Sequence, residues 1–123
     1  MKTIESTAQA LEVAKRYLEK RGYASVAAVR GTGGPSAWLS AVDPDDGSLA
    51  VVKVSLARGA SRGFPAEDHS RRARAEAEAV AVAHLASLEG ASDTRVRFDL
   101  VCLVPVGEGR AFVRHHVDAF GSD

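Results

Sequence analysis

A tight turn between two apolar segments is the feature that most constrains how this chain folds. Ala37–Val42 and Leu49–Leu56 are short and mainly apolar, which is typical of buried strands. The intervening Asp43-Pro44-Asp45-Asp46-Gly47 has the composition of a turn. Parallel strands need a crossover connection of a dozen or more residues, and this link is much shorter. The two strands are therefore predicted to form an antiparallel hairpin.

Apolar residues at helical spacing predict one helix before this hairpin and one after it. The capping-box spacing of Ser6-Thr7-Ala8-Gln9 begins the first helix, and Gly22 ends it in a left-handed conformation. Ser70 caps the second helix, which runs to about Leu88. One side of the second helix is rich in alanine and can lie close against a sheet: Ala73, Ala77, Val80, Ala81 and His84.

Three further segments complete the predicted sheet. Residues 23–29 and 111–117 have the composition of short strands. Residues 95–104 alternate strongly between two faces, and Arg97 and Asp99 begin the second of these faces. The resulting order, α-β-β-β-α-β-β, predicts an α/β protein of the α+β kind with a mixed sheet. The second helix is the crossover that makes one pair of strands parallel.

The composition is that of one ordinary domain, residues 1–123. Hydrophobic residues make up 46% and charged residues 26%, and the 16 acidic residues balance the 16 basic ones. No overall field therefore attracts the protein to nucleic acid or to an anionic membrane. The apolar runs are too short for a membrane span or a secretory signal, and the single Cys102 cannot form an internal disulfide. We expect a cytoplasmic protein with no membrane partner and no cofactor.

Four short sequence segments, here called strings, are distributed over nearly the whole chain. They are Ala14-Lys15-Arg16-Tyr17-Leu18-Glu19-Lys20-Arg21-Gly22-Tyr23, Arg62-Gly63-Phe64-Pro65-Ala66-Glu67, Arg97-Phe98-Asp99-Leu100-Val101 and His115-His116-Val117-Asp118-Ala119-Phe120. Their order and spacing resemble the YraN-like family of uncharacterised proteins, which have the restriction-endonuclease-like PD-(D/E)XK fold. The resemblance implies that an aspartate and a glutamate on the second and third strands hold a divalent metal ion. It also implies a lysine that orients or activates the attacking water.

This chain departs from that pattern at every catalytic position. Trp38 occupies the position expected for the aspartate, Lys53 that of the glutamate and Ser55 that of the lysine. The early glutamate of the family falls at about Leu11. Neither strand contains any carboxylate, so an alignment shift of one residue changes nothing. Because magnesium requires carboxylate and water oxygens, no catalytic residue and no metal ligand is predicted at these positions.

Other polar groups have structural explanations as well as functional ones. Asp43, Asp45 and Asp46 are close enough in sequence to bind a metal ion, but tight turns favour aspartate for backbone reasons alone. His115 and His116 are adjacent on a predicted strand, so their side chains face opposite sides and do not share a metal ion.

The most suggestive polar feature is a concentration of positive charge between residues 53 and 74. Six basic residues and two acidic ones, Glu67 and Asp68, leave a local excess of four positive charges. The basic residues are Lys53, Arg58, Arg62, Arg71, Arg72 and Arg74. Helix starts and arginine-rich loops bind phosphate. A solvated helix surface that Glu76 and Glu78 balance explains the same residues.

Three functions remain open. The first is a non-catalytic protein of nuclease fold that binds DNA or RNA weakly. The second is a protein-interaction or homodimerisation module that uses the sheet, Trp38 or the last strand. The third is a divalent-metal-dependent endonuclease whose carboxylates have migrated, with Asp43, Asp99 and Glu76 as candidates. Trp38 is itself either core packing or a stacking surface for a base or a partner side chain.

Overall fold

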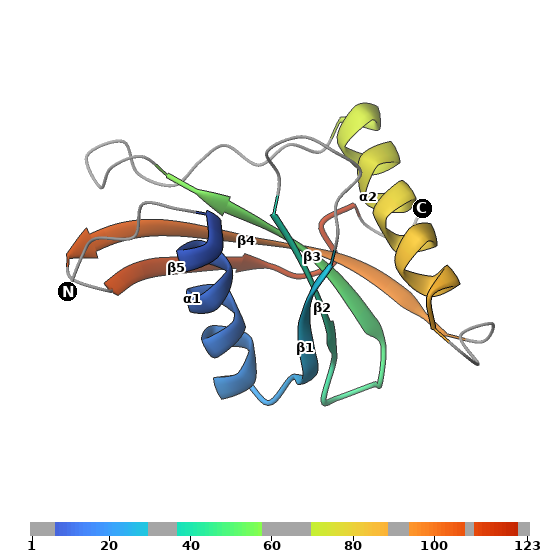
Figure 1. Cartoon of the computed structure of the whole chain (residues 1–123), viewed down its shortest axis with the longest axis horizontal. Coiled ribbons are helices and arrows are strands. Elements are labelled where there is room, and N and C mark those ends of the chain that lie inside the picture. Colours follow the sequence, from blue (N-terminus) through green and yellow to red (C-terminus); the bar gives the residue numbers. More distant parts are fainter. Residues whose placement is uncertain (1–6, 30–36, 58–69, 89–93, 108–109, 121–123) are drawn as a thin grey trace.

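The chain folds into two helices and five strands in a computed structural model that describes residues 7–29, 37–57, 70–88, 94–107 and 110–120 (Figure 1). The elements are α1 (Thr7–Lys20), β1 (Ala24–Val29), β2 (Ala37–Val42), β3 (Leu49–Leu56), α2 (Arg71–Ala86), β4 (Val96–Gly107) and β5 (Arg110–His116). Their order is the predicted α-β-β-β-α-β-β. The structure is a mixed α+β fold.

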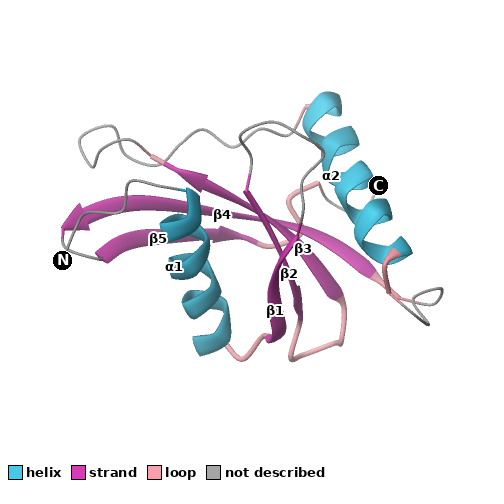
Figure 2. Cartoon of the chain, in the orientation of Figure 1, coloured by secondary structure: helices cyan, strands magenta, loops and turns pink. Residues whose placement is uncertain are grey.

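The strands form one mixed sheet in the order β1-β2-β3-β4-β5. All neighbouring strands are antiparallel except β3 and β4, which are parallel. Figure 2 shows the sheet between the two helices. The predicted hairpin is confirmed by the antiparallel pairing of β2 with β3, in which Leu39 lies opposite Val52. The predicted crossover is also confirmed, because α2 joins the parallel strands β3 and β4.

Several predicted boundaries need correction. β2 and β3 have the expected bounds, but β4 extends to Gly107, past the expected end at Val104. A proline lacks the backbone N–H that a central strand needs, which is why the sequence pattern ends before Pro105. The pairing of β3 with β4 ends at Leu103, so the last part of β4 pairs with β5 and tolerates proline. β5 begins at Arg110 and ends one residue before the predicted end.

The ends of the helices follow local backbone chemistry. The Ser70 hydroxyl accepts a hydrogen bond of 3.1 Å from the Ala73 amide, which confirms the predicted cap of α2. α2 ends at Ala86 rather than at about Leu88, with Ser87 as its C-cap. Gly22, with φ +92°, has the left-handed conformation expected after α1. The predicted capping residue of α1, Ser6, lies outside the described residues.

The sheet buries a different hydrophobic cluster on each face. On one face, here the α1 face, α1 packs through Ala10, Ala14 and Leu18 against Val52, Val101 and other small and branched residues of the sheet. On the opposite face, here the α2 face, α2 packs against a smaller cluster. That cluster consists of Trp38, Val51, Ala77, Val80 and Ala81. In the described part of the chain, neither helix is long and apolar enough to cross a membrane.

Trp38 is part of this second cluster, with only 3% of its surface exposed. The interpretation of Trp38 as core packing is confirmed. The interpretation as a stacking surface is wrong, because a buried indole cannot receive a base. The alanines of α2 let the helix approach the sheet closely, and the indole fills the space between them.

Trp38→Ala is expected to lower the free energy of unfolding by about 3–5 kcal/mol, because it removes a large buried side chain. Denaturant titration followed by circular dichroism measures this loss. A suitable control is Val82→Ala, since Val82 lies on α2 and is 67% exposed. This control is expected to change stability by less than about 0.5 kcal/mol. Equal effects of the two substitutions would contradict the assignment of Trp38 to the core.

Candidate functional site

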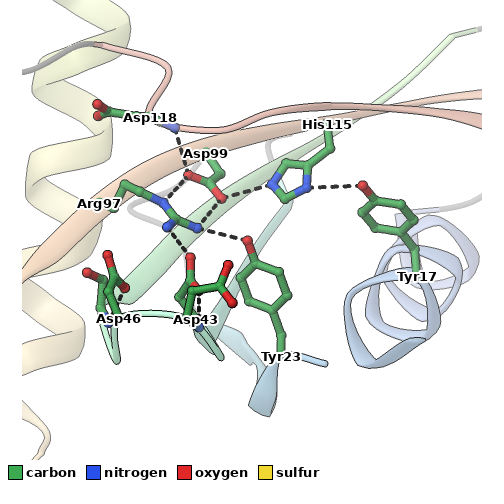
Figure 3. Close-up of polar contacts among 10 residues, drawn as sticks. Tyr17, Tyr23, Asp43, Asp46, Arg97, Asp99, His115 and Asp118 are labelled. Atoms are coloured by element: carbon green, nitrogen blue, oxygen red, sulfur yellow. Dashed lines mark hydrogen bonds and ion pairs between the residues drawn. The ribbon is translucent and has the colours of Figure 1, made fainter. Parts of the chain in front are cut away.

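The most prominent polar arrangement surrounds the buried carboxylate of Asp99 on β4 (Figure 3). Oδ1 of Asp99 accepts hydrogen bonds from Nε of Arg97 at 2.9 Å and from the Asp118 amide at 3.0 Å. Oδ2 accepts a second bond from Arg97, through Nη2 at 2.9 Å, and lies 2.8 Å from Nε2 of His115. The Asp99 side chain is 0% exposed, and both of its oxygens are fully hydrogen-bonded.

Arg97 connects Asp99 to two other segments of the chain. Its Nη1 donates to the carboxylate of Asp43, which follows β2, and its Nη2 donates to the Tyr23 hydroxyl at 2.9 Å. The other oxygen of Asp43 accepts a bond of 2.7 Å from the Asp45 amide. Arg97 therefore joins the start of β1 and the β2–β3 turn to β4.

His115 extends these contacts to α1. Its Nδ1 lies 3.1 Å from the hydroxyl oxygen of Tyr17, and the two rings meet edge to face with their centroids 5.5 Å apart. Five segments thus meet in one set of side chains, which we call the polar network. Its members are Tyr17, Tyr23, Asp43, Arg97, Asp99 and His115.

The polar network holds its two carboxyl groups in the ionised form. Burial raises the pKa of Asp99, but the hydrogen bonds from His115, Arg97 and the Asp118 amide outweigh burial and leave this pKa below its ordinary value. The hydrogen bond from Arg97, followed by that from the Asp45 amide, lowers the pKa of Asp43. Hydrogen bonding to Asp99 in turn raises the pKa of Arg97, so the guanidinium stays charged.

This arrangement is better suited to holding the fold together than to binding a metal ion. Asp43 and Asp99 both use their oxygens on Arg97, and Glu76 lies on α2 across the sheet. The described residues contain no group of three histidine, cysteine or acidic side chains that could hold a metal ion. The hypothesis of migrated catalytic carboxylates therefore gains no support from the geometry.

The aspartates of the β2–β3 turn have structural contacts instead of a shared ligand. Asp43 is the partner of Arg97, and Oδ1 of Asp46 accepts a hydrogen bond of 2.9 Å from the Ser48 amide. This bond lowers the pKa of Asp46. The backbone explanation for these turn residues is thus the one that their contacts support.

The predicted degenerate positions lie on the α2 face. Trp38 is directly opposite Lys53 in the pairing of β2 with β3, and Nζ of Lys53 lies 6.0 Å from the centroid of the Trp38 ring. Ser55, half-buried, follows Lys53 on the same side of β3. The structure therefore brings Trp38 and Lys53 together, with an ammonium over an indole where the resemblance implies two carboxylates.

The structure also locates most of the predicted basic residues. Lys53 is half-buried beside the cluster that α2 covers, and the first turn of α2 carries three arginines. Arg71 and Arg72 are exposed and Arg74 is half-buried. The other predicted basic residues, Arg58 and Arg62, lie outside the described part of the chain.

The two adjacent histidines face opposite sides of the sheet, as predicted. His115 lies opposite Val101 and points to the α1 face, whereas His116 lies opposite Leu100, on the α2 face. The prediction for the two histidines is confirmed. Cys102 is buried, with 3% of its surface exposed.

Sequence reasoning did not predict the polar network. It treated Asp99 as one residue of a family-like string and as a candidate migrated carboxylate, and it considered His115 only beside His116 and within the last string. The signal that was present is the pair Arg97 and Asp99, two opposite charges on one face of an otherwise apolar strand. Charged side chains at buried positions need partners, so such a pair predicts an ionic contact. The roles of Tyr17 and Tyr23 depend on long-range contacts that no local spacing reveals.

Comparison of the chain with models of known protein families finds no matching family, and comparison with curated proteins finds no similar sequence.

Asp99→Asn is expected to lower the free energy of unfolding by about 3–5 kcal/mol, because it breaks a buried ion pair and leaves Arg97 short of an anionic partner. Urea denaturation measures the change. Asp45→Asn makes the same chemical change at an exposed position of the turn and is expected to cost less than about 0.5 kcal/mol. Similar losses for the two variants would show that the polar network does not stabilise the fold.

Stability is expected to fall in acid. The pKa values of Asp43 and Asp99 are lower in the folded protein than in the unfolded chain. Their contribution to the free energy of unfolding is therefore fully present above about pH 4. This contribution is lost as the pH falls through the pKa values of the folded protein. Thermal melting measured from neutral pH down to acid should show this decline, and a shallower decline for Asp99→Asn. Parallel curves for both proteins would contradict the assignment.

Proposed function

We propose that this protein is a non-catalytic relative of nucleases with the restriction-endonuclease-like fold, and that it binds nucleic acid through positive charges on the α2 face. One observation carries the proposal. Four cations lie on or beside this face, against Glu76 and Glu78 on α2, and the described parts of β2 to β5 present no carboxylate there. They are Lys53, Arg71, Arg72 and Arg74.

The topology supports the assignment to the restriction-endonuclease-like fold. The order that carries the resemblance is one helix, three strands, a second helix and two further strands, with the second helix as a candidate parallel crossover. The chain has α1, then the antiparallel strands β1, β2 and β3, then α2, then β4 parallel to β3. Fold alone does not define function, so the assignment of nucleic acid as a ligand rests on the charges.

The strings that carry the resemblance also support it, because three of them meet in the polar network. Tyr17 and Tyr23 belong to the first string, Arg97 and Asp99 to the third, and His115 to the last. These strings are far apart in sequence but contact one another around one buried carboxylate. Their shared role in holding the fold accounts for why they occur together in a chain that has lost the catalytic pattern.

The geometry at the degenerate positions argues against metal-dependent cleavage. A hard divalent cation needs anionic oxygens, and the two facing residues supply an indole, buried with 3% exposure, and an ammonium. Lys53 instead favours an anion such as a phosphate. Residues at the start of α2 act in the same sense, because the partial positive charge of a helix N-terminus adds to that of the arginines.

Binding is expected to be weak and sensitive to salt. With no net charge, the protein has no long-range attraction to nucleic acid. Each phosphate contact contributes about −0.9 to the slope of log affinity against log salt for duplex DNA. Four contacts would therefore give a slope of about −3 to −4.

Fluorescence anisotropy with labelled duplex and single-stranded oligonucleotides, titrated at several salt concentrations, tests the proposal. The double variant Arg71→Glu, Arg72→Glu should reduce the salt slope by about two. A glutamate in the first turn of a helix interacts favourably with the helix dipole and does not destabilise the helix. Loss of binding by this variant would therefore not reflect unfolding of α2. The matched control, Arg16→Glu with Lys20→Glu, makes the same change of charge on α1 across the sheet.

Two results would contradict the proposal. Absence of binding to any oligonucleotide at low salt would exclude nucleic acid as a ligand. Cleavage in magnesium or manganese that stops on addition of a chelator would show that the protein is an active nuclease. The expected result is salt-sensitive binding, no cleavage, and weaker binding for the α2 double variant than for the α1 control.

A further inference from the structure

β5 forms one edge of the sheet, and its side chains alternate between the two faces. Ala111 and Val113 pack against the cluster on the α1 face, and His115 belongs to the polar network. The alternate residues lie on the α2 face, where Arg110, Phe112 and Arg114 are exposed and His116 is half-buried. We call these four residues, Arg110, Phe112, Arg114 and His116, the β5 strip.

Phe112 is the feature of the β5 strip that folding does not explain. It lies opposite Val104, which is buried with 2% of its surface exposed, yet 62% of Phe112 itself remains exposed. A phenylalanine at such a position contributes little to the core, and it presents a flat apolar ring between two arginines. Exposed aromatic rings between cations are typical of surfaces that bind unpaired bases.

The charged side chains that the described parts of β2 to β5 place on the α2 face are all basic, whereas α2 itself also carries Glu76 and Glu78. Lys53 lies opposite Leu100, which lies opposite His116, so a row of paired residues joins the β5 strip to the cations beside α2. The described residues of β2 to β5 that face this side include no carboxylate. On the α1 face, Arg97 lies between the carboxylates of Asp43 and Asp99. A polyanion therefore complements the strand positions of the α2 face better than those of the α1 face.

We infer that the β5 strip binds single-stranded nucleic acid, with the ring of Phe112 stacked on a base and Arg110 and Arg114 in contact with phosphates. Neighbouring residues of the strip are about 7 Å apart along the strand, so both arginines lie within reach of the backbone on either side of one base. The inference rests on the proposed function and adds to it a preference for unpaired bases, because stacking requires a base that is outside a duplex.

Phe112→Ala tests the stacking contact. Affinity for a labelled single-stranded oligonucleotide is expected to fall roughly 5- to 150-fold, since stacking on one aromatic ring is worth that factor. Affinity for a duplex is expected to stay unchanged. Phe112→Leu keeps an apolar side chain without an aromatic face and should behave like Phe112→Ala. Val82→Ala, at an exposed apolar position of α2, is the matched control and should change neither affinity.

Phe112→Trp supplies a direct spectroscopic readout. This variant should retain single-strand binding, and its exposed indole should be quenched when a base stacks on it. The native Trp38 is buried and is the sole tryptophan of the chain, so its emission gives a constant background. A Phe112→Trp protein that binds a single strand without quenching would overturn the inference.

The outcomes separate this inference from the proposed function. If the wild-type protein binds neither single strands nor duplexes, the proposed function fails and the β5 strip fails with it. If it binds both and Phe112→Ala weakens neither, only the inference about the β5 strip is wrong. A different outcome is that sedimentation shows the wild-type protein to be a dimer, which Phe112→Ala dissociates while nucleic-acid binding stays intact. In that case β5 is an interface with a second copy of the protein, which also overturns the inference.

Discussion

An ionised carboxylate such as that of Asp99 is stable away from water only when donors surround both of its oxygens. Here the donors come from Arg97 on the same strand, from His115 on β5 and from the backbone of Asp118 beyond it. Removing any one of these segments leaves a buried charge without its partner. The remaining network connects α1, β1 and the β2–β3 turn to the same centre, so one end of the molecule depends on a single anion.

The polar network also explains how the two faces of the sheet differ. On the α1 face, Arg97 forms ion pairs with Asp43 and Asp99, and α1 covers a large cluster of apolar residues. On the α2 face, the core is smaller and the exposed positions carry cations and one aromatic ring. A chain with no net charge can therefore still carry cations at the strand positions that face α2, while Asp43 and Asp99 lie with Arg97 on the opposite side.

Under the proposed function, the lack of metal ligands and the stability of the fold have separate physical causes. Metal-dependent cleavage needs anionic oxygens, and the facing residues Trp38 and Lys53 supply none. The fold needs a packed sheet and a satisfied buried ion pair, and neither depends on those positions. Trp38 even adds to the core beneath α2. If the proposal is right, a large apolar residue and a cation stand in this chain where a related nuclease would hold its metal ion.

Local sequence alone determined the type and order of the elements, since strand alternation, helical spacing, Gly22 and the turn after β2 act over a few residues. It also determined that β2 and β3 contain no carboxylate. Only the tertiary structure decided which polar residues meet. Tyr17 and His115 are 98 positions apart, and Arg97 and Asp43 are 54 apart. Contacts at such separations depend on strand order and helix placement, which local periodicity does not encode. The exposure of Phe112 was decided in the same way, by the absence of a further strand beyond β5 in the described sheet.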